Sequence, residues 1–358
     1  MSKEIAGRLK RLRTFLKQNG TCAILITNPH NRRYLSGFDG TSGVLLIGQE
    51  QAILVTDFRY LEQAKTQASQ FTVQRWREDL FSELAPVVKD AGWEKIAFES
   101  KHVVYHNYRE MEQKIPAELK PYEDTVEKLR IIKSEAELAI LRDGAKMLDS
   151  AFEHICDIIK PGMQEKELAL ETEMYLRRKG AEEPSFRFIV ASGIRGAMPH
   201  GTASSKEMER GELVTIDFGG VFNGYATDMT RTVSLGEPGE RCREIYSMVL
   251  KSQYAARESL KPGMKCSDAD AVARDIFEQD GYGQYFGHGL GHGVGLETHE
   301  QPTLNPRSKT ILEPGMVVTV EPGLYIPNFG GVRIEDMVCL TEEGAEIMTR
   351  SPRELITI

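Results

Sequence analysis

Histidines gather in one glycine-rich stretch of the chain. His288, His292 and His299, three of its eight histidines, lie within twelve residues, in the segment GHGLGHGVGLETHE at positions 287–300. Histidine is the commonest metal ligand in proteins and also carries protons near neutral pH. Glycine lets the backbone approach whatever the histidines bind. The segment therefore predicts one metal ligand and two further imidazoles for acid–base work or substrate binding.

Four carboxylates lie on or beside apolar, strand-like runs. Asp217 ends the run LVTID, Asp228 follows Ala-Thr, Glu321 ends VVTVE, and Glu335 lies within VRIED. With one imidazole they form a mixed nitrogen and oxygen ligand set, which suits paired divalent cations rather than a thiolate-bound structural zinc. Either Asp alone could be a turn-favouring strand end. A lone Glu beside an apolar run would be costly to bury, although a structural pair of Arg333 with Glu335 is the alternative there.

Other polar residues are less informative by themselves. His200 lies in the loop sequence MPHG, where a lone histidine is more often structural than functional. Arg187 and Tyr225 are too ordinary to assign from sequence. The glycine-rich stretch is not a phosphate-binding loop, because it lacks the pattern GxxxxGK[ST] and follows no strand-to-helix turn.

Length and composition limit the class of protein. A chain of 358 residues is expected to form two domains, and 41% hydrophobic with 27% charged residues is typical of a globular protein. A net charge of -8 argues against nucleic acid or an anionic membrane as the main partner. Five scattered cysteines without a C-x-x-C pattern suit a reducing compartment. With no signal peptide and no membrane-length apolar run, the expected location is the cytoplasm.

The first part of the chain alternates helix and strand patterns. Apolar residues at helical spacing cover positions 5–16, and strand-like or helix-like runs follow at 22–26, 44–47, 53–56, 58–68, 71–76 and 95–98. This order predicts an α/β domain with a mixed sheet over residues 1–125. Proline and charge in the segment 116–124 predict a linker, so a second domain would span residues 126–358.

The second part begins with helices and becomes rich in strands and glycine. Ser134 and Glu137 have the spacing of a capping box before a long helix that ends near Ile159. A second helix is expected over residues 164–179, and a further helical region over 240–279.

A faint internal duplication runs through this second part. IKPGM at 159–163 recurs as LKPGM at 260–264, and GELVTID at 211–217 recurs as GMVVTVE at 315–321. The second repeat aligns Asp217 with Glu321, and Asp228 and Glu335 follow in roughly corresponding places. A pseudo-twofold domain would bring two carboxylate pairs together on facing strands, which is how a binuclear metal site could arise.

In this ordered combination the chain resembles a known family. Asp217, Asp228, His292, Glu321 and Glu335, with the segments HGLGHGVGLETHE and VRIED, look like the pita-bread metallopeptidases, which comprise methionine aminopeptidase, prolidase and aminopeptidase P. The resemblance covers the chain from about residue 130, and the N-terminal part is similar to the creatinase/prolidase N-terminal domain. It implies an α+β pita-bread catalytic domain behind the α/β N-terminal domain.

The resemblance also implies a role for each residue of the metal site. Asp217 would bind one metal, His292 and Glu321 the second, and Asp228 and Glu335 would bridge both. The cofactor would be two divalent ions per chain, manganese or cobalt in vitro, with zinc or other ions possible.

Further roles are expected from the chemistry of such a site and from the same resemblance. Glu321, a ligand beside the attacking water, is the best general-base candidate, and His299 would stabilise the intermediate or the leaving group. His200 and His288 would contact substrate or carry protons, and Arg333 would contribute to substrate binding.

The implied activity is hydrolysis of Xaa-Pro bonds at the N-terminus of short proline-containing peptides. The segments 37–43 and 56–62 look more like short bacterial aminopeptidase P than prolidase, so aminopeptidase activity is the first expectation. Prolidase activity is the alternative, with Arg187, Arg195 or Arg333 available to capture a dipeptide carboxylate. A metal-free creatinase-like hydrolase and a non-catalytic peptide-binding module are disfavoured by the five intact ligands. A homodimer is expected, with Asp39 near the entrance of a neighbouring active site.

Overall fold

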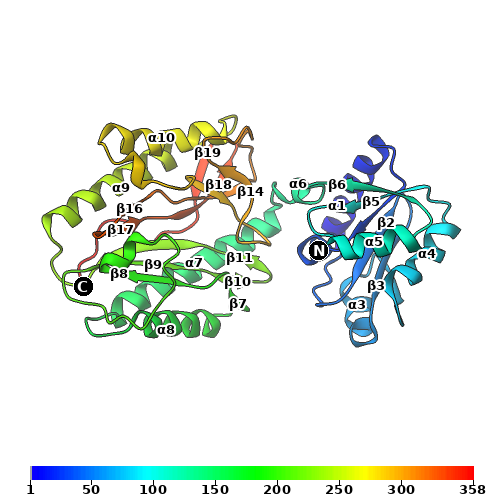
Figure 1. Cartoon of the computed structure of the whole chain (residues 1–358), viewed down its shortest axis with the longest axis horizontal. Helices are drawn as coiled ribbons and strands as arrows, with labels where there is room; N and C mark the ends of the chain where they lie inside the picture. Colours follow the sequence, from blue (N-terminus) through cyan, green and yellow to red (C-terminus); the bar gives the residue numbers. More distant parts are fainter. Residues whose placement is uncertain (1) are drawn as a thin grey trace. The chain divides into compact units, whose positions relative to one another are not determined.

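The computed structural model describes residues 2–358, and the chain divides into two compact units, Met1–Arg130 and Ile131–Ile358. Both units combine helices with sheets (Figure 1), which confirms the α/β and α+β classes expected from the sequence. Among the described residues, no helix is long and apolar enough to cross a membrane.

The first unit is built around one six-stranded mixed sheet, in the order β4-β3-β2-β1-β5-β6. Helices α4 and α5 cover one of its faces, where Phe81, Leu84 and Met111 pack against Leu25 and Leu46. The elements of this unit are α1 (Ser2–Gln18), β1 (Ala23–Ile26), α2 (Pro29–Ser36), β2 (Val44–Gly48), β3 (Ala52–Thr56), η1 (Phe58–Tyr60), α3 (Leu61–Gln67), β4 (Thr72–Arg75), α4 (Leu80–Asp90), β5 (Lys95–Glu99), α5 (Tyr105–Lys114), β6 (Glu118–Tyr122) and α6 (Glu127–Arg130).

The segment expected to be a linker is instead strand β6, which pairs in parallel with β5 at the edge of the sheet. A proline is tolerated in an edge strand because its missing N–H can face away from the ladder, and Pro121 occupies such a place. The short helix α6 also belongs to this unit, because Arg130 and Glu127 both form hydrogen bonds with the buried Asn31, at 2.8 and 2.6 Å. The boundary between the two units therefore falls after Arg130.

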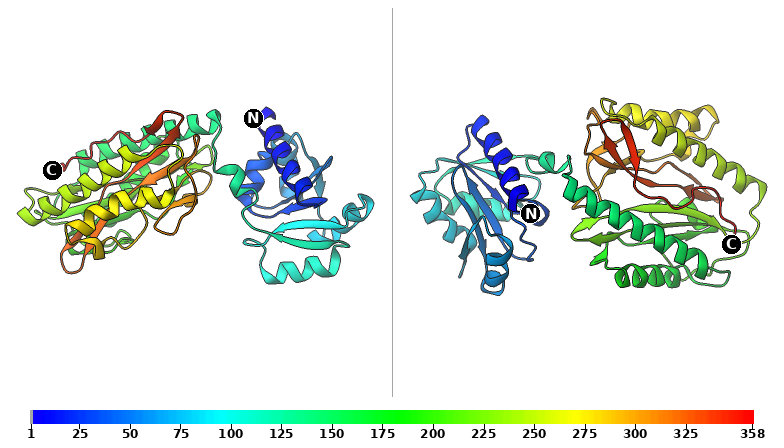
Figure 2. Two further views of the ribbon diagram at one scale, coloured as in Figure 1. Left: turned by 90° about the horizontal axis from the view of Figure 1, so that it is seen from above. Right: turned by 180° about the vertical axis from the view of Figure 1, so that it is seen from behind.

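The second unit holds two sets of helices with strands between them. Helices α7 and α8 lie on one side and α9 and α10 on the other (Figure 1), and the view from behind in Figure 2 shows the same layers. Its elements are α7 (Glu135–Ile158), α8 (Glu165–Arg178), β7 (Glu183–Pro184), β8 (Ile189–Ser192), η2 (Gly193–Ala197), β9 (Leu213–Phe218), β10 (Gly220–Phe222), β11 (Tyr225–Ala226), β12 (Met229–Ser234), α9 (Glu240–Ser259), α10 (Cys266–Gln279), η3 (Gly283–Tyr285), β13 (Gly291–Gly293), β14 (Glu300–Leu304), β15 (Val317–Val320), β16 (Gly323–Ile326), β17 (Gly330–Arg333), β18 (Asp336–Thr341) and β19 (Gly344–Ile347).

Local sequence signals explain where these helices begin. The Ser134 hydroxyl accepts from the Glu137 amide at 3.4 Å, and the Glu137 carboxylate accepts from the Ser134 amide at 2.8 Å. This reciprocal capping box opens α7, as predicted. The helical region expected at 240–279 is two helices, α9 and α10, separated by LKPGM, the second copy of the first repeat.

The internal duplication corresponds to matching backbone geometry in two halves, α7–β12 and α9–β19. Gly162 and Gly263 have φ values of 84° and 85°. The amide of each donates a 2.8 Å hydrogen bond to a distant carbonyl, that of Met208 in the first half and that of Leu312 in the second. Strand β9 pairs antiparallel with β12, and β15 pairs antiparallel with β18. The pseudo-twofold organisation expected from the repeats is therefore present.

Candidate active site

All nine residues nominated from the sequence line one cavity of about 570 Å³ in the second unit. Its volume lies in the range of small-molecule sites. The nine come from both halves and span more than a hundred positions of the chain: His200, Asp217, Asp228, His288, His292, His299, Glu321, Arg333 and Glu335.

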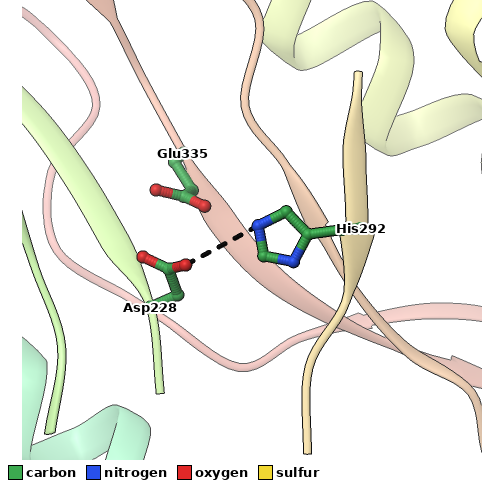
Figure 3. A group of neighbouring side chains, drawn as sticks. All are labelled: Asp228, His292 and Glu335. Atoms are coloured by element: carbon green, nitrogen blue, oxygen red, sulfur yellow. Dashed lines mark ion pairs between the residues drawn. The ribbon is translucent and has the colours of Figure 1, made fainter. Parts of the chain in front are cut away.

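Three of the five nominated metal ligands form a tight cluster. One ligand atom from each of Asp228, His292 and Glu335 lies within 4.8 Å of the others, and the three side chains point toward a common centre in Figure 3. His292 lies in the middle of β13, whereas Asp228 precedes β12 and Glu335 lies between β17 and β18. Nε2 of His292 is 3.7 Å from Asp228 Oδ2 and 3.4 Å from Glu321 Oε1.

The imidazole of His292 is oriented by its neighbours in the sheet. Its Nδ1–H donates to the Gly293 carbonyl at 3.0 Å, which leaves the Nε2 lone pair facing the carboxylates. Burial lowers the pKa of His292, so the ring is held in the neutral form that a metal ligand requires. The Thr319 hydroxyl accepts from the His292 amide at 3.0 Å and donates to Glu321 at 3.3 Å.

The other two nominated ligands are Asp217, on β9, and Glu321, directly after β15. Arg333 donates from Nη2 to Asp217 Oδ2 at 2.6 Å. Within the described part of the chain, the second carboxylate oxygen of Asp217 is buried without a hydrogen-bond partner, and so is Oδ1 of Asp228. Such oxygens are costly to bury unless a cation or a donor satisfies them.

The electrostatics of the cavity point the same way. Burial, reinforced by the neighbouring carboxylates, raises the pKa values of Asp228 and Glu335 well above the usual range. Burial also raises the pKa of Glu321, although nearby His288 and Arg333 oppose the shift. One arginine cannot balance four clustered carboxylates. The buried oxygens without partners and the mixed oxygen and nitrogen donors therefore fit divalent cations.

Arg333 and Tyr325 form a buried hydrogen-bonded group beside the carboxylates. Besides Asp217, the guanidinium donates to Thr230 Oγ1 at 3.0 Å, to the Tyr325 hydroxyl at 2.9 Å and to the Pro199 carbonyl at 3.3 Å. The Tyr325 hydroxyl also lies 2.8 Å from Nε2 of His288. Sequence reasoning missed Tyr325, because a tyrosine within the apolar run GLYI carries no local sign of a polar role.

The remaining histidines occupy two sides of the cavity. The ring of His299 lies 4.3 Å from that of His292, centroid to centroid, and its pKa is lowered by burial and then by His292. His288 donates from Nδ1 to the Gly289 carbonyl at 2.8 Å, so its Nε2 accepts from the Tyr325 hydroxyl. His200 is exposed, in the turn that directly follows η2.

The three arginines considered for carboxylate capture have different surroundings. Arg195 is not among the lining residues of the cavity, and it bonds instead to Glu165 and to the Thr202 carbonyl. Arg333 lines the cavity, but its donors are taken up by four groups. Arg187 lines the cavity and is exposed, and its side chain has no hydrogen bond or ion pair among the described residues. Tyr225, also left unassigned by sequence, donates to Glu137 at 2.9 Å.

Comparison with known proteins adds independent evidence. The chain is 47% identical to the solved structure of a Xaa-Pro dipeptidase from Bacillus anthracis, with a TM-score of 0.97 and coverage of 99% of this chain and 100% of the other. A Xaa-Pro dipeptidase from Pyrococcus furiosus is 40% identical, over 98% of this chain and 99% of its own length. An X-Pro aminopeptidase structure from Thermotoga maritima is 37% identical, with a TM-score of 0.91 and coverage of 98% and 99%.

Two family descriptions account for nearly the whole sequence. The creatinase/prolidase N-terminal domain matches residues 8–132, and metallopeptidase family M24 matches residues 139–342, more than half of the chain. The resemblance inferred from the ligand motifs is confirmed. The chain belongs to metallopeptidase family M24 and is a metal-dependent hydrolase of peptide bonds.

Proposed function

We propose that this protein hydrolyses the peptide bond before proline in Xaa-Pro dipeptides, with two divalent cations, manganese by preference, bound by Asp217, Asp228, His292, Glu321 and Glu335. The observation that carries the metal site is the group of three ligand atoms within 4.8 Å of one another. Two buried carboxylate oxygens without partners support it. When bound, such cations supply Lewis acidity that polarises the scissile carbonyl and lowers the pKa of the attacking water.

The proposed proton carrier is Glu321. Its Oε1 lies beside His292 and accepts a hydrogen bond from Thr319, which fixes one carboxylate oxygen and leaves the other to take a proton from the attacking water. The proton then passes to the proline nitrogen as the C–N bond breaks. The imidazole of His299, held neutral by burial, would donate to the carbonyl oxygen as negative charge develops there.

The other nominated residues would shape the substrate site. His288 is fixed by Gly289 and Tyr325, whereas His200 is exposed at the cavity, and both would contact the peptide. Arg333 has four partners already, so we assign it to positioning Asp217, where its bond is 2.6 Å, rather than to capturing a substrate carboxylate.

The dipeptide assignment depends on Arg187. A dipeptide ends in a free carboxylate directly after proline, and an available guanidinium is the group best suited to bind it. Arg187 is the candidate with donors to spare, on a segment anchored where Ser185 bonds to the Thr227 amide and the Thr298 hydroxyl, at 3.2 and 2.9 Å. The dipeptidase names of the relatives from Bacillus anthracis and Pyrococcus furiosus support the same assignment.

Aminopeptidase action on longer peptides is the second candidate. It is favoured by the N-terminal segment 37–43 and by the name of the Thermotoga maritima relative. Hydrolysis of Ala-Pro, Ala-Pro-amide and Ala-Pro-Ala by the metal-loaded enzyme separates the two. We expect Ala-Pro to be the best substrate, and Arg187→Ala to lower kcat/KM for Ala-Pro by about 10- to 100-fold, mainly through KM. Equal turnover of Ala-Pro-Ala, with no effect of Arg187→Ala, would establish the aminopeptidase instead.

We also propose that the chain works as a homodimer, in which the loop around Asp39 approaches the active site of the other copy. In this structure Asp39 accepts a 2.6 Å hydrogen bond from Gln63, which holds the loop against α3. Light scattering at micromolar concentration should give twice the chain mass. A fully active monomer would contradict the proposal.

A further inference from the structure

Two buried carboxylates outside the cavity each hold a loop that brings a histidine to it. Glu165, the first residue of α8, is 0% exposed, and Asp270, in α10, is 1% exposed. Neither is among the described residues that line the cavity. Buried carboxylates need several donors to offset their lost hydration, and the donors in both cases come from the loops that carry His200 and His288.

The carboxylate of Glu165 closes both ends of the His200 loop. Oε1 accepts from the amide and the hydroxyl of Ser192, both at 2.9 Å. Oε2 accepts from the amide and the hydroxyl of Ser204, at 3.1 and 2.7 Å, and from Arg195 Nη1. Arg195 reaches across the loop to the Thr202 carbonyl at 2.9 Å. Residues 192–204 are therefore held at both ends and in the middle, with His200 exposed between these points.

The carboxylate of Asp270 does the same for the His288 loop. It receives a two-pronged bond from Arg274, at 2.7 and 3.0 Å, and a 2.9 Å bond from the Leu290 amide. Arg274 donates onward to the carbonyls of Phe286 and His288, at 3.0 and 2.7 Å, and its guanidinium stacks 4.4 Å from the Phe286 ring centroid. The backbone on both sides of His288 is thereby fixed to α10.

We infer that Glu165 and Asp270 are positioning residues, each acting through an arginine and backbone amides to set the loop of one cavity histidine, His200 or His288. The inference rests on the proposed function for the catalytic importance of these histidines. A displacement of about 1 Å in a substrate-contacting group can cost on the order of 10²-fold in rate. Five hydrogen bonds reach the buried Glu165 carboxylate and three reach that of Asp270, and both sets of bonds oppose such a displacement.

The variants Glu165→Gln and Asp270→Asn keep the shape of each side chain and remove its charge. We expect each to lower kcat/KM for Ala-Pro by about 10- to 100-fold, as for residues that orient active-site groups, with metal content unchanged. A matched control is Glu173→Gln, which breaks the i,i+4 pair of Glu173 with Arg177 on the outer side of α8. That variant should stay within about twofold of wild type, because exposed helix pairs contribute little.

Double-mutant cycles distinguish positioning from general support of the fold. In the His200→Ala background, Glu165→Gln should cause almost no further loss, whereas in the His288→Ala background it should cause its full loss. Asp270→Asn should show the opposite pattern. Equal losses in both backgrounds would overturn the inference, because a merely structural carboxylate would not distinguish between the two histidines.

Hydrogen exchange on the metal-loaded enzyme gives a second measurement that does not require turnover. Exchange at amides 193–202, which do not bond to Glu165 themselves, should rise in Glu165→Gln and stay unchanged in Asp270→Asn. Amides 286–289 should show the reverse.

If the wild-type enzyme fails to hydrolyse Ala-Pro, the proposed function is wrong, while hydrogen exchange still tests whether the two carboxylates hold their loops. If Glu165→Gln does not fold, Arg195→Lys and Arg274→Lys serve instead, since a lysine cannot reproduce the forked bonds. Unchanged exchange in both loops would overturn the inference.

Discussion

In the first half of the catalytic unit, Asp217 lies within β9, opposite Thr230 of β12. In the second half, β15 ends at Val320, opposite Asp336, so Glu321 follows its strand directly. The antiparallel strand pairing is repeated in the two halves, but Asp217 lies inside its strand whereas Glu321 lies just after its strand. The second half also supplies His292, and no described histidine of the first half joins the cluster of three.

The halves are joined by reciprocal bonds at the site. Arg333, from the second half, donates to Asp217 of the first at 2.6 Å. Thr230, from the first half, donates its hydroxyl to Glu335 of the second at 2.7 Å, and its carbonyl accepts from the Glu335 amide at 3.1 Å. Neither half therefore contains a complete set of oriented ligands. The duplicated strands and helices position the site, and the residues that differ between the two copies supply its ligands and the groups that orient them.

The largest expected effect tests whether both halves are indispensable. Asp228→Asn, in the first half, and Glu335→Gln, in the second, should each lower the rate by at least about 10³-fold with little loss of fold. A neutral amide holds cations poorly, and both positions are proposed to bridge two of them. Activity, metal content and thermal unfolding of both variants decide the matter. Near-normal turnover with metal retained, in either variant, would remove the bridging assignment.

Substitutions of the two neighbouring histidines of the second half should have different effects, one on metal binding and the other on the rate. His292→Ala should lose metal, because its Nε2 faces Asp228 and Glu321. His299→Ala should keep metal and lose about 10²- to 10⁴-fold in rate, as expected of a group that stabilises charge or transfers protons. Metal analysis of both purified variants is the measurement. Equal occupancy in the two would contradict the division of roles.

The bonds between the halves should have intermediate effects. Arg333→Lys keeps the charge but cannot maintain the fork that reaches Asp217, Tyr325 and Thr230 together. We expect metal affinity or activity to fall by about 10- to 100-fold, the usual effect of removing a group that orients a ligand. Thr230→Val, which removes the hydroxyl donor to Glu335, is the reciprocal test from the first half. Wild-type affinity in both variants would show that the halves orient their ligands independently.

The sequence revealed what is encoded in short segments. The repeats, the capping box at Ser134 and the carboxylates on or beside apolar runs are each visible within a few residues. The pseudo-twofold fold was therefore predicted, and the nine nominated residues do share one cavity. The proposed catalytic role of each one stays a prediction. Helix α4 was not predicted, because Pro86 inside it interrupts the helical pattern.

Long-range partners were beyond sequence reasoning. Arg333 and Asp217 are more than a hundred residues apart, and nothing local indicates that they pair. Asp270 and Arg274 read as an ordinary i,i+4 pair on a helix, although the structure buries the carboxylate against the His288 loop. Strand β6 was taken for a linker because proline and charge are typical of both loops and edge strands.

Alanine substitutions at the two glycines of the second repeat should differ in their effect on the free energy of unfolding, although the backbone conformations match. Gly211 and Gly315 have φ values of 89° and 85°. A Cβ added at Gly211 would find its nearest atom at 3.9 Å, whereas one at Gly315 would lie 2.9 Å from Ile132 Cγ2. Gly315→Ala should therefore reduce the free energy of unfolding by about 1–3 kcal/mol more than Gly211→Ala. Urea unfolding followed by circular dichroism measures both, and equal losses would show that the contact relaxes.

Alanine substitutions at the two glycines of the first repeat should have the smallest effects on the free energy of unfolding, and nearly equal ones. Gly162 and Gly263 have nearly the same positive φ, 84° and 85°, and an added Cβ would meet no atom within 4 Å at either position. The remaining cost of alanine is the left-handed backbone conformation, about 1 kcal/mol. Gly162→Ala and Gly263→Ala should thus lower the free energy of unfolding equally, to within about 0.5 kcal/mol. Urea unfolding of both variants is the measurement, and clearly unequal losses would show that the two turns carry different strain despite their matching φ values.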